Sequence, residues 1–205
     1  MILTVTPNPA LDVSYELDRL APGESLRVVR VGARAGGKGV NVARVAAAMG
    51  RPVFAMGLLG GTTGEQVEAD LGAGGVPHHF LPGPGETRTT VNIHARGNDQ
   101  TTLLNEEGPA TGAAEWARLV QAVRPVAHDA DVGVVSGSLP PGLTDEAIAE
   151  LLTAAPTYQG WIVDARGPAL MAALAAGPAV VKPNLAELRE TVEADDVLTA
   201  ARALQ

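Results

Sequence analysis

The sequence predicts an α/β protein of three layers, in which helices cover both faces of a mostly parallel central sheet and a small inserted β-sheet forms a lid. Short β-branched runs alternate with alanine-rich helical stretches, and the content is 46% hydrophobic but only 3% aromatic. A core of Ala, Val and Leu suits close packing of helices on a sheet. Two stretches with a period-two pattern interrupt the alternation and predict the inserted sheet.

The predicted strands of the central sheet are short apolar runs, as expected for parallel strands buried on both faces. They cover residues 2–6, 53–59, 132–135, 161–164 and 180–181.

Helices are predicted between these strands from start and stop signals. One covers residues 40–49 and stops at Gly50. A second lies near 64–72, where Thr62-Thr63-Gly64-Glu65 has the spacing of a capping box. A third begins after Thr144, with Asp145 and Glu146 in its first turn. The last stretch, 184–205, predicts one or two helices, with Asp195 and Asp196 ahead of an alanine-rich run.

The two interrupting stretches, residues 12–31 and 87–105, predict antiparallel hairpins. The second contains Arg96-Gly97-Asn98-Asp99, which is typical of a hairpin turn. The two stretches lie on either side of a glycine-rich loop. We therefore expect them to form a flap that covers a ligand at that loop and excludes water.

Charge and composition exclude several classes of partner. The formal net charge of −8 argues against nucleic acid and acidic membranes, because both are bound by summed basic charge. The chain has no cysteine, so disulfides and thiolate metal sites are excluded. No window approaches the roughly 18 apolar residues of a membrane span, and we expect a cytoplasmic protein. The four histidines lack a metal-ligand spacing and are expected to be structural or surface residues.

The strongest local signal is the segment Ala35-Gly36-Gly37-Lys38-Gly39-Val40-Asn41, which directly precedes an amphipathic helix. Backbone N–H groups and the positive end of the helix dipole therefore face the loop, which suits a polar or anionic ligand. It is not a Walker A loop, because Gly39 follows Lys38 where Ser or Thr is needed. A glycine turn that only caps the helix is the alternative.

Three further side chains are candidates for ligand binding, each with a plainer alternative. Asp12 follows the first strand at the sheet edge where open α/β folds bind ligands, although such residues often only form turns. Ser138 follows a buried strand among small residues that permit close approach, or lies in an ordinary loop. Arg88 offers a planar fork suited to a phosphate, or is a solvated surface residue.

Asn184 and Glu187 are three residues apart on a helix predicted to begin after Pro183, so they share one face. Such a pair can orient hydrated Mg²⁺ through water, because magnesium keeps much of its hydration shell. Asn-x-x-Glu is also a common tetrapeptide by chance.

The motifs occur in an order that resembles the ribokinase/PfkB family along essentially the whole chain, and most closely its 1-phosphofructokinase and tagatose-6-phosphate kinase branch. This resemblance implies a ribokinase-like fold, with residues 1–205 as a partial kinase domain and lid insertions near 12–31 and 87–105. The motifs that carry it are Asn8-Pro9-Ala10-x-Asp12, Gly36-Gly37-Lys38-Gly39-x-Asn41-x-Ala43, Thr87-Arg88, Ser136-Gly137-Ser138-Leu139-Pro140, Val163-Asp164 and Lys182-Pro183-Asn184-x-x-Glu187.

The resemblance also implies roles for eleven residues. Asp12, Gly37 and Asn41 are expected to hold sugar hydroxyls, and Lys38, Arg88, Ser138 and Arg27 the phosphate already on the sugar. Lys182, Asn184, Glu187 and Asp164 are expected on the side of ATP and Mg²⁺, with Asn184 and Glu187 holding the metal through water.

The activity implied is ATP-dependent phosphorylation of a ketohexose phosphate, first of all fructose 1-phosphate to fructose 1,6-bisphosphate. Tagatose 6-phosphate and fructose 6-phosphate are alternative substrates, and a non-catalytic sugar-phosphate-binding protein is an alternative of another class. A homodimer through the lid is also expected from the resemblance.

The chain departs from the family pattern in one respect. The family's Gly-Ala-Gly-Asp motif, whose turn forms an anion hole and whose Asp is the catalytic base, does not occur in the 205 residues. Loss of both groups is expected to suppress turnover by orders of magnitude. We therefore expect the chain to be the N-terminal part of a kinase whose C-terminal part is missing, with a degenerate kinase as the alternative.

Overall fold

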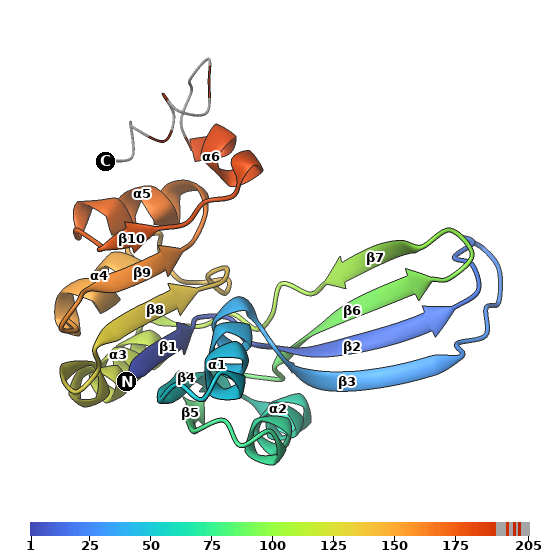
Figure 1. The fold of residues 1–205 in the computed structure, drawn as a ribbon, viewed down its shortest axis with the longest axis horizontal. Coiled ribbons are helices and arrows are strands. Elements are labelled where there is room, and N and C mark those ends of the chain that lie inside the picture. Colours follow the sequence, from blue (N-terminus) through green and yellow to red (C-terminus); the bar gives the residue numbers. More distant parts are fainter. Residues whose placement is uncertain (192–195, 197–198, 200, 202–205) are drawn as a thin grey trace.

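The computed structural model describes residues 1–191 together with 196, 199 and 201. In that part of the chain the central sheet has six strands in the order β10-β9-β8-β1-β4-β5, and every neighbouring pair is parallel (Figure 1). The strands are β1 (Ile2–Thr6), β4 (Val53–Leu59), β5 (His78–Pro82), β8 (Val132–Ser136), β9 (Trp161–Asp164) and β10 (Val180–Val181).

Helices cover both faces of this sheet, which gives the predicted three layers. The helices are α1 (Lys38–Ala48), α2 (Gly61–Ala73), α3 (Ala113–His128), α4 (Ala147–Ala154), α5 (Gly167–Ala175) and α6 (Leu185–Thr191). Side chains of α1 and α2 form one buried cluster with the sheet, and side chains of α3, α4 and α5 form another.

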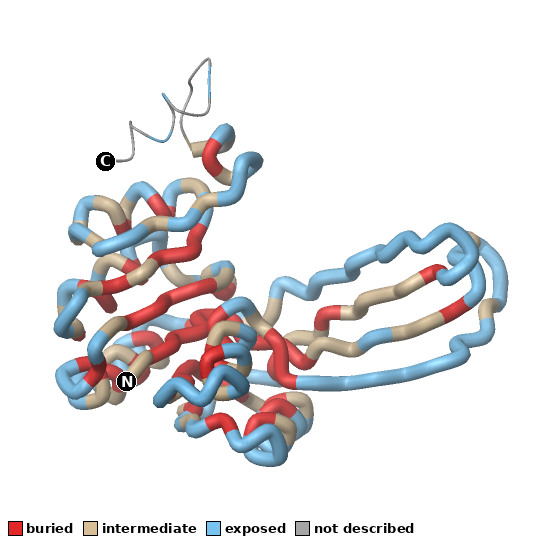
Figure 2. Tube along the Cα trace, in the orientation of Figure 1, coloured by how far each residue is buried: buried red, intermediate tan, exposed pale blue. Residues whose placement is uncertain are grey.

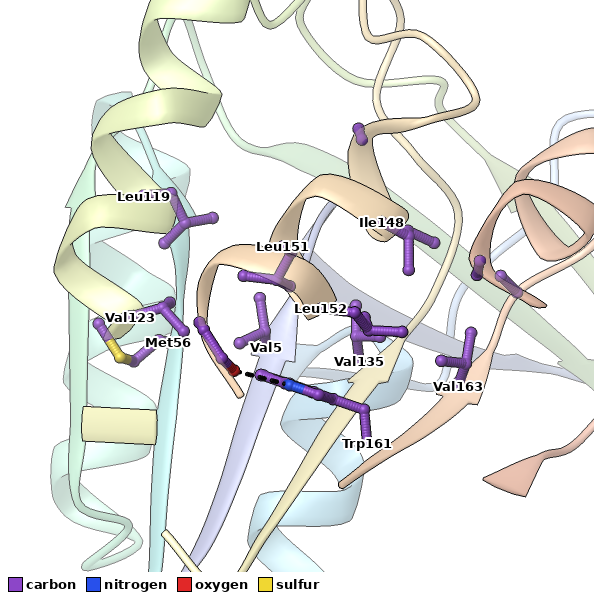
Figure 3. Packing of buried hydrophobic residues seen from close by; sticks show 14 of the residues in the cluster. Val5, Met56, Leu119, Val123, Val135, Ile148, Leu151, Leu152, Trp161 and Val163 are labelled. Carbon is purple, nitrogen blue, oxygen red and sulfur yellow. Dashed lines mark hydrogen bonds between the residues drawn. The ribbon is translucent and has the colours of Figure 1, made fainter. Parts of the chain in front are cut away.

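The alternation of side chains along the strands supplies both clusters. In β1, Leu3 and Val5 enter the α3–α5 cluster, whereas Ile2 packs against the cluster on the α1 side, because successive strand residues point to opposite faces. Figure 3 shows the first cluster, where the indole of Trp161 donates a hydrogen bond of 2.8 Å to the carbonyl oxygen of Ala155. The polar end of a large apolar ring is thereby satisfied inside the core.

A second sheet of four strands projects away from the main body (Figure 1). Its order is β3-β2-β6-β7, and the pair β2–β6 is parallel while the two outer pairs are antiparallel. The outer strands carry most of its exposed residues (Figure 2). The strands are β2 (Ala10–Leu17), β3 (Arg30–Gly36), β6 (Arg88–Ala95) and β7 (Gln100–Asn105).

Most of the predicted elements are present. The predicted strands 2–6, 53–59, 161–164 and 180–181 have the observed bounds, and the strand predicted at 132–135 extends by one residue to Ser136. The hairpin turn at 96–99 joins β6 to β7 as expected. The helix after Pro183 is α6, but the rest of the predicted helical tail, residues 192–205, lies largely outside the described residues.

Two capping predictions are wrong. Helix α2 already begins at Gly61, and its N-terminus is capped from outside: the Glu86 carboxylate accepts hydrogen bonds from Thr63 through the backbone N (3.1 Å) and the hydroxyl (3.0 Å). The predicted capping box at 62–65 is therefore absent. Helix α4 begins at Ala147, so Asp145 and Glu146 precede its first turn.

Strand β5 and helices α3 and α5 were not predicted from the sequence. Among the described residues, no helix combines the length and apolar character that crossing a membrane requires.

Candidate functional site

A cleft of about 880 Å³ lies where the carboxyl ends of the central strands meet the base of the second sheet. This is the edge at which open parallel α/β sheets bind their ligands. Eight of the eleven predicted site residues line it: Asp12, Gly37, Lys38, Asn41, Arg88, Ser138, Asp164 and Glu187. Arg27, Lys182 and Asn184 do not line the cleft.

Asp12 reaches the cleft because the chain passes from β1 directly into β2 through residues 7–9. In β2 it lies opposite Arg34 of β3 and Thr90 of β6. A Cβ added at Gly36 would lie 2.2 Å from the Asp12 carboxyl carbon, so any larger residue there would displace this carboxylate from its present position. Burial raises the pKa of Asp12 above its ordinary value, and the charges of Arg34, Arg88 and Arg44 oppose that shift.

The glycine-rich loop forms a tight turn that sets the N-terminus of α1 on the end of β1. Gly37 has φ of 102°, which favours glycine, and no side chain caps the helix there. A Cβ added at Gly39 would lie 2.5 Å from the hydroxyl oxygen of Thr6. Gly37, Lys38 and Asn41 line the cleft, so the N-terminus of α1 lies at its edge, where the helix dipole favours negative charge.

Lys38 joins the two sides of the cleft. Its Nζ lies 2.9 Å from Oδ1 of Asp164 and 3.4 Å from Oε1 of Glu187. Burial lowers the pKa of Lys38, but hydrogen bonding and charge from Asp164 and then Glu187 outweigh this effect and raise the pKa overall. Half of the Lys38 side chain remains exposed, so its ammonium is accessible to a ligand in the cleft.

Asp164 is the most connected carboxylate of the site. Besides Lys38, its carboxylate receives a hydrogen bond of 3.2 Å from the Ser136 hydroxyl and lies 3.5 Å from Nζ of Lys182. Lys182 thus contacts the site through Asp164, from outside the cleft.

Asn184 and Glu187 bond to each other's backbone at the start of α6. Oδ1 of Asn184 accepts from the N–H of Glu187 at 2.9 Å, and Oε2 of Glu187 accepts from the N–H of Asn184 at 2.8 Å. This reciprocal pair is a capping box, which the sequence interpretation of these two residues did not include. It leaves Oε1 of Glu187 directed at Lys38.

The carboxylates of Asp164 and Glu187 fit a divalent cation held mainly through water. One oxygen of each carboxylate lies within 3.4 Å of the Lys38 ammonium nitrogen, so the two carboxylates already share one positive charge. Magnesium keeps much of its hydration shell and needs few direct protein ligands, so two carboxylates are enough for such a site.

Arg88 is held by backbone carbonyl groups at the start of β6. Its Nε donates to the carbonyl oxygen of Asn8 at 3.2 Å, and its Nη1 donates to that of Glu106 at 3.2 Å. Burial lowers the pKa of Arg88, and the negative charges of Asp12 and Glu106 oppose this shift. A guanidinium has five N–H donors, so these two bonds orient the group and leave donors for a ligand.

Several cleft residues were missed as candidates: Asn8, Thr90, Asn105, Glu106, Asp145 and Arg166. Asn8 stood within the first family motif, so the sequence did contain a signal for it. The other five residues have no such signal in the sequence, because they lie in strands and loops with ordinary composition.

The predicted site residue Arg27 is exposed in the segment between β2 and β3.

The fold and the cleft define an α/β protein with a cleft at the carboxyl edge of a parallel sheet, lined by both acidic and basic side chains. Residues 8–205 match the pfkB family of carbohydrate kinases, and the chain belongs to this family. It is 37% identical over 194 residues to a tagatose-6-phosphate kinase of Staphylococcus epidermidis. This match covers 93% of the chain and 62% of that protein, so the chain spans less than two thirds of its curated relative.

Solved structures show the same fold. Phosphofructokinase-2 from Escherichia coli in complex with fructose-6-phosphate superposes with a TM-score of 0.89 at 33% identity, over 99% of this chain and 69% of that one. A Thermotoga maritima protein named "possible 1-phosphofructokinase" gives a TM-score of 0.89 at 27% identity, over 100% of this chain and 68% of that one. The predicted family and the ribokinase-like three-layer fold are confirmed.

Proposed function

We propose that this chain binds a phosphorylated ketohexose and belongs to an enzyme that transfers the γ-phosphoryl group of ATP to a hydroxyl of that sugar. The observation that carries the proposal is that Asp12, Lys38 and Arg88 line a single cleft. One carboxylate, one ammonium and one guanidinium suit a ligand that has both hydroxyls and a phosphate.

In this proposal Asp12, Gly37 and Asn41 hold the sugar hydroxyls, and Arg88, Lys38 and Ser138 hold the phosphate already on the sugar. Asn184 and Glu187 hold Mg²⁺ through water, and Lys182 and Asp164 lie beside them on the nucleotide side. ATP supplies the transferred phosphoryl group and Mg²⁺ offsets its charge. Arg27 remains a prediction without support from the cleft geometry.

The first substrate we propose is fructose 1-phosphate. Tagatose 6-phosphate is the alternative that the name of the Staphylococcus relative supports. Fructose 6-phosphate is a third candidate, supported by the complex of the E. coli protein. Calorimetric titration of the chain with each sugar phosphate ranks the three directly.

We further propose that the 205-residue chain binds its sugar phosphate with little or no turnover, because Gly-Ala-Gly-Asp does not occur in it. A coupled ADP-release assay run beside calorimetry tests this. Binding without turnover, with turnover gained by a longer chain that contains the motif, supports a kinase. Absence of turnover in such a longer chain supports a non-catalytic binding protein.

Lys38→Ala tests the phosphate pocket. The expected result is weaker binding of fructose 1-phosphate, because one positive charge leaves the cleft. Unchanged affinity in this variant contradicts the assignment.

We propose, finally, a cytoplasmic homodimer that pairs through the second sheet, which acts as a lid. Its outer strands expose Val31 and Leu103 by 64% and 56%. Val31→Glu is expected to shift the sedimentation of a dimer to that of a monomer. Val45→Glu is the matched control, since Val45 is a similarly exposed valine on α1, at 59%. Identical sedimentation of both variants contradicts pairing through the lid.

A further inference from the structure

Asn8 is a buried polar residue at the crossing between the two sheets, and the proposed function gives it no role. It lies in the three-residue link between β1 and β2 and is only 6% exposed. It also lines the cleft beside Arg88. A polar side chain in such a place is retained only with good hydrogen bonds, because burial without them is costly.

The side chain of Asn8 binds the chain where it returns from the second sheet to the body. Its Nδ2 donates to the carbonyl oxygen of Glu107 at 2.9 Å, although the two residues are 99 positions apart. Next to this contact, the Glu106 carboxylate accepts from the N–H of Thr89 at 2.7 Å. Segments 7–9, 88–89 and 106–108 are thereby fixed together at the base of the second sheet.

Arg88 lies between these segments and takes its orientation from them. The backbone oxygens of Asn8 and Glu106, each 3.2 Å away, accept from Nε and Nη1 of Arg88. One of these carbonyls belongs to Asn8 itself, and the other precedes the residue that the Asn8 amide binds. A shift of the returning chain therefore moves one acceptor of the guanidinium relative to the other.

The returning segment 106–108 packs closely against the side chains of Asn8 and Arg88. Gly108 has φ of 92°, and a Cβ added there would lie 2.8 Å from Oδ1 of Asn8 and 3.2 Å from Cδ of Arg88. Only glycine lets the returning chain pack against both side chains. Asn8, Gly108 and Arg88 thus form one close-packed unit.

We infer that Asn8 is a positioning residue for Arg88: its amide fixes the returning chain so that two backbone carbonyls hold the guanidinium with its remaining donors facing the cleft. The inference rests on the proposed function, in which Arg88 binds the phosphate on the sugar. An oriented arginine loses less conformational freedom when the ligand binds, and this strengthens binding without any contact between Asn8 and the ligand.

A double-mutant cycle tests the inference, with calorimetric titration of fructose 1-phosphate as the measurement. Asn8→Ala is combined with Arg88→Lys, which keeps the positive charge and loses the planar fork that the carbonyls hold. Asn8→Ala is expected to weaken binding by about 2- to 10-fold in the wild-type background, the range for one side chain that must be ordered on binding. In the Arg88→Lys background it is expected to change affinity little, because there is no longer an oriented fork to lose.

Asn105→Ala is the matched control, since Asn105 is another asparagine that lines the cleft. Its effect is expected to be the same in both backgrounds. If Asn8→Ala fails to give a cooperative unfolding transition, Asn8→Ser replaces it, because serine keeps a polar group but is too short to reach the Glu107 carbonyl.

The outcomes separate the inference from the proposed function. If the Asn8 substitution lowers the affinity for fructose 1-phosphate equally in both backgrounds, or in neither, the positioning role is overturned while sugar-phosphate binding stands. Failure of the wild-type chain to bind fructose 1-phosphate, tagatose 6-phosphate or fructose 6-phosphate overturns the proposed function and, with it, the role of Arg88.

Discussion

The contact of Lys38 with two carboxylates leads to a prediction in which removal of a charge strengthens binding. The Lys38 ammonium pairs with Asp164 at 2.9 Å and with Glu187 at 3.4 Å. To contact a sugar phosphate, the lysine must give up part of these contacts. Glu187→Gln removes one of them, and the capping box at the start of α6 survives because glutamine also serves at that position.

The size of the effect follows from the exposure of the pair. Lys38 is 50% exposed, so the ion pair is screened by solvent and contributes about 0.2–1 kcal/mol. When the ion pair is absent, ligand binding no longer has to break it, and a saving of this free energy corresponds to an affinity about 1.4- to 5-fold higher. We therefore expect Glu187→Gln to bind fructose 1-phosphate more tightly than the wild type in calorimetric titrations without Mg²⁺.

The matched control is Glu107→Gln. Glu107 lines the same cleft but forms no ion pair with Lys38, so it reports the general effect of removing a negative charge there. The control is expected to gain less affinity than Glu187→Gln. An equal gain in both variants, or weaker binding by Glu187→Gln, refutes the competition of Glu187 with the ligand for Lys38.

Three further predictions concern the packing and charge of the site and the core. Gly36→Ala places a Cβ 2.2 Å from the Asp12 carboxyl carbon and is expected to lower the free energy of unfolding in urea by about 1–3 kcal/mol. Gly32→Ala on the same strand is its control, because a Cβ there meets nothing within 4 Å; equal stability of both variants contradicts the packing argument. Asp12→Asn is expected to raise the free energy of unfolding at pH 7 while it weakens sugar-phosphate binding. Because the folded pKa of Asp12 is raised above the ordinary 3.8, its ionisation costs stability as pH rises through that region, so the gain from Asn should vanish in urea titrations below about pH 4. A variant less stable than the wild type at pH 7 shows that the charge of Asp12 is stabilising. Trp161→Phe leaves the buried carbonyl of Ala155 without its donor and is expected to cost about 1–3 kcal/mol in the same urea titration, and a cost near zero shows that the bond contributes nothing.

The elements predicted from the sequence are those with strong local patterns. The runs at 2–6, 53–59 and 161–164 are apolar and β-branched, and the strands have these bounds. Strand β5 begins with His78-His79 and ends at Pro82, so its composition resembles a loop, and only its pairing with β4 makes it a strand. Helix α3 contains Pro125, which weakens any helix prediction, and burial of one of its faces outweighs that effect.

The site could be predicted as a set of residues but not as a network. The loop with Gly37 and Lys38 and the place of Asp12 soon after the first strand follow from local sequence, and these residues share the cleft as expected. The pairing of Lys38 with Asp164 joins residues 126 positions apart, and no local pattern encodes it. The same holds for the parallel pairing of β2 with β6, which brings Arg88 next to the link that contains Asn8.

The most direct test of a shared pocket for a phosphorylated hexose is a crystal structure of the chain with fructose 1-phosphate. We predict the phosphate within hydrogen-bond distance of Arg88 and Lys38, and a sugar hydroxyl bonded to the Asp12 carboxylate. A ligand bound away from this cleft, or one that contacts none of these three side chains, contradicts the account.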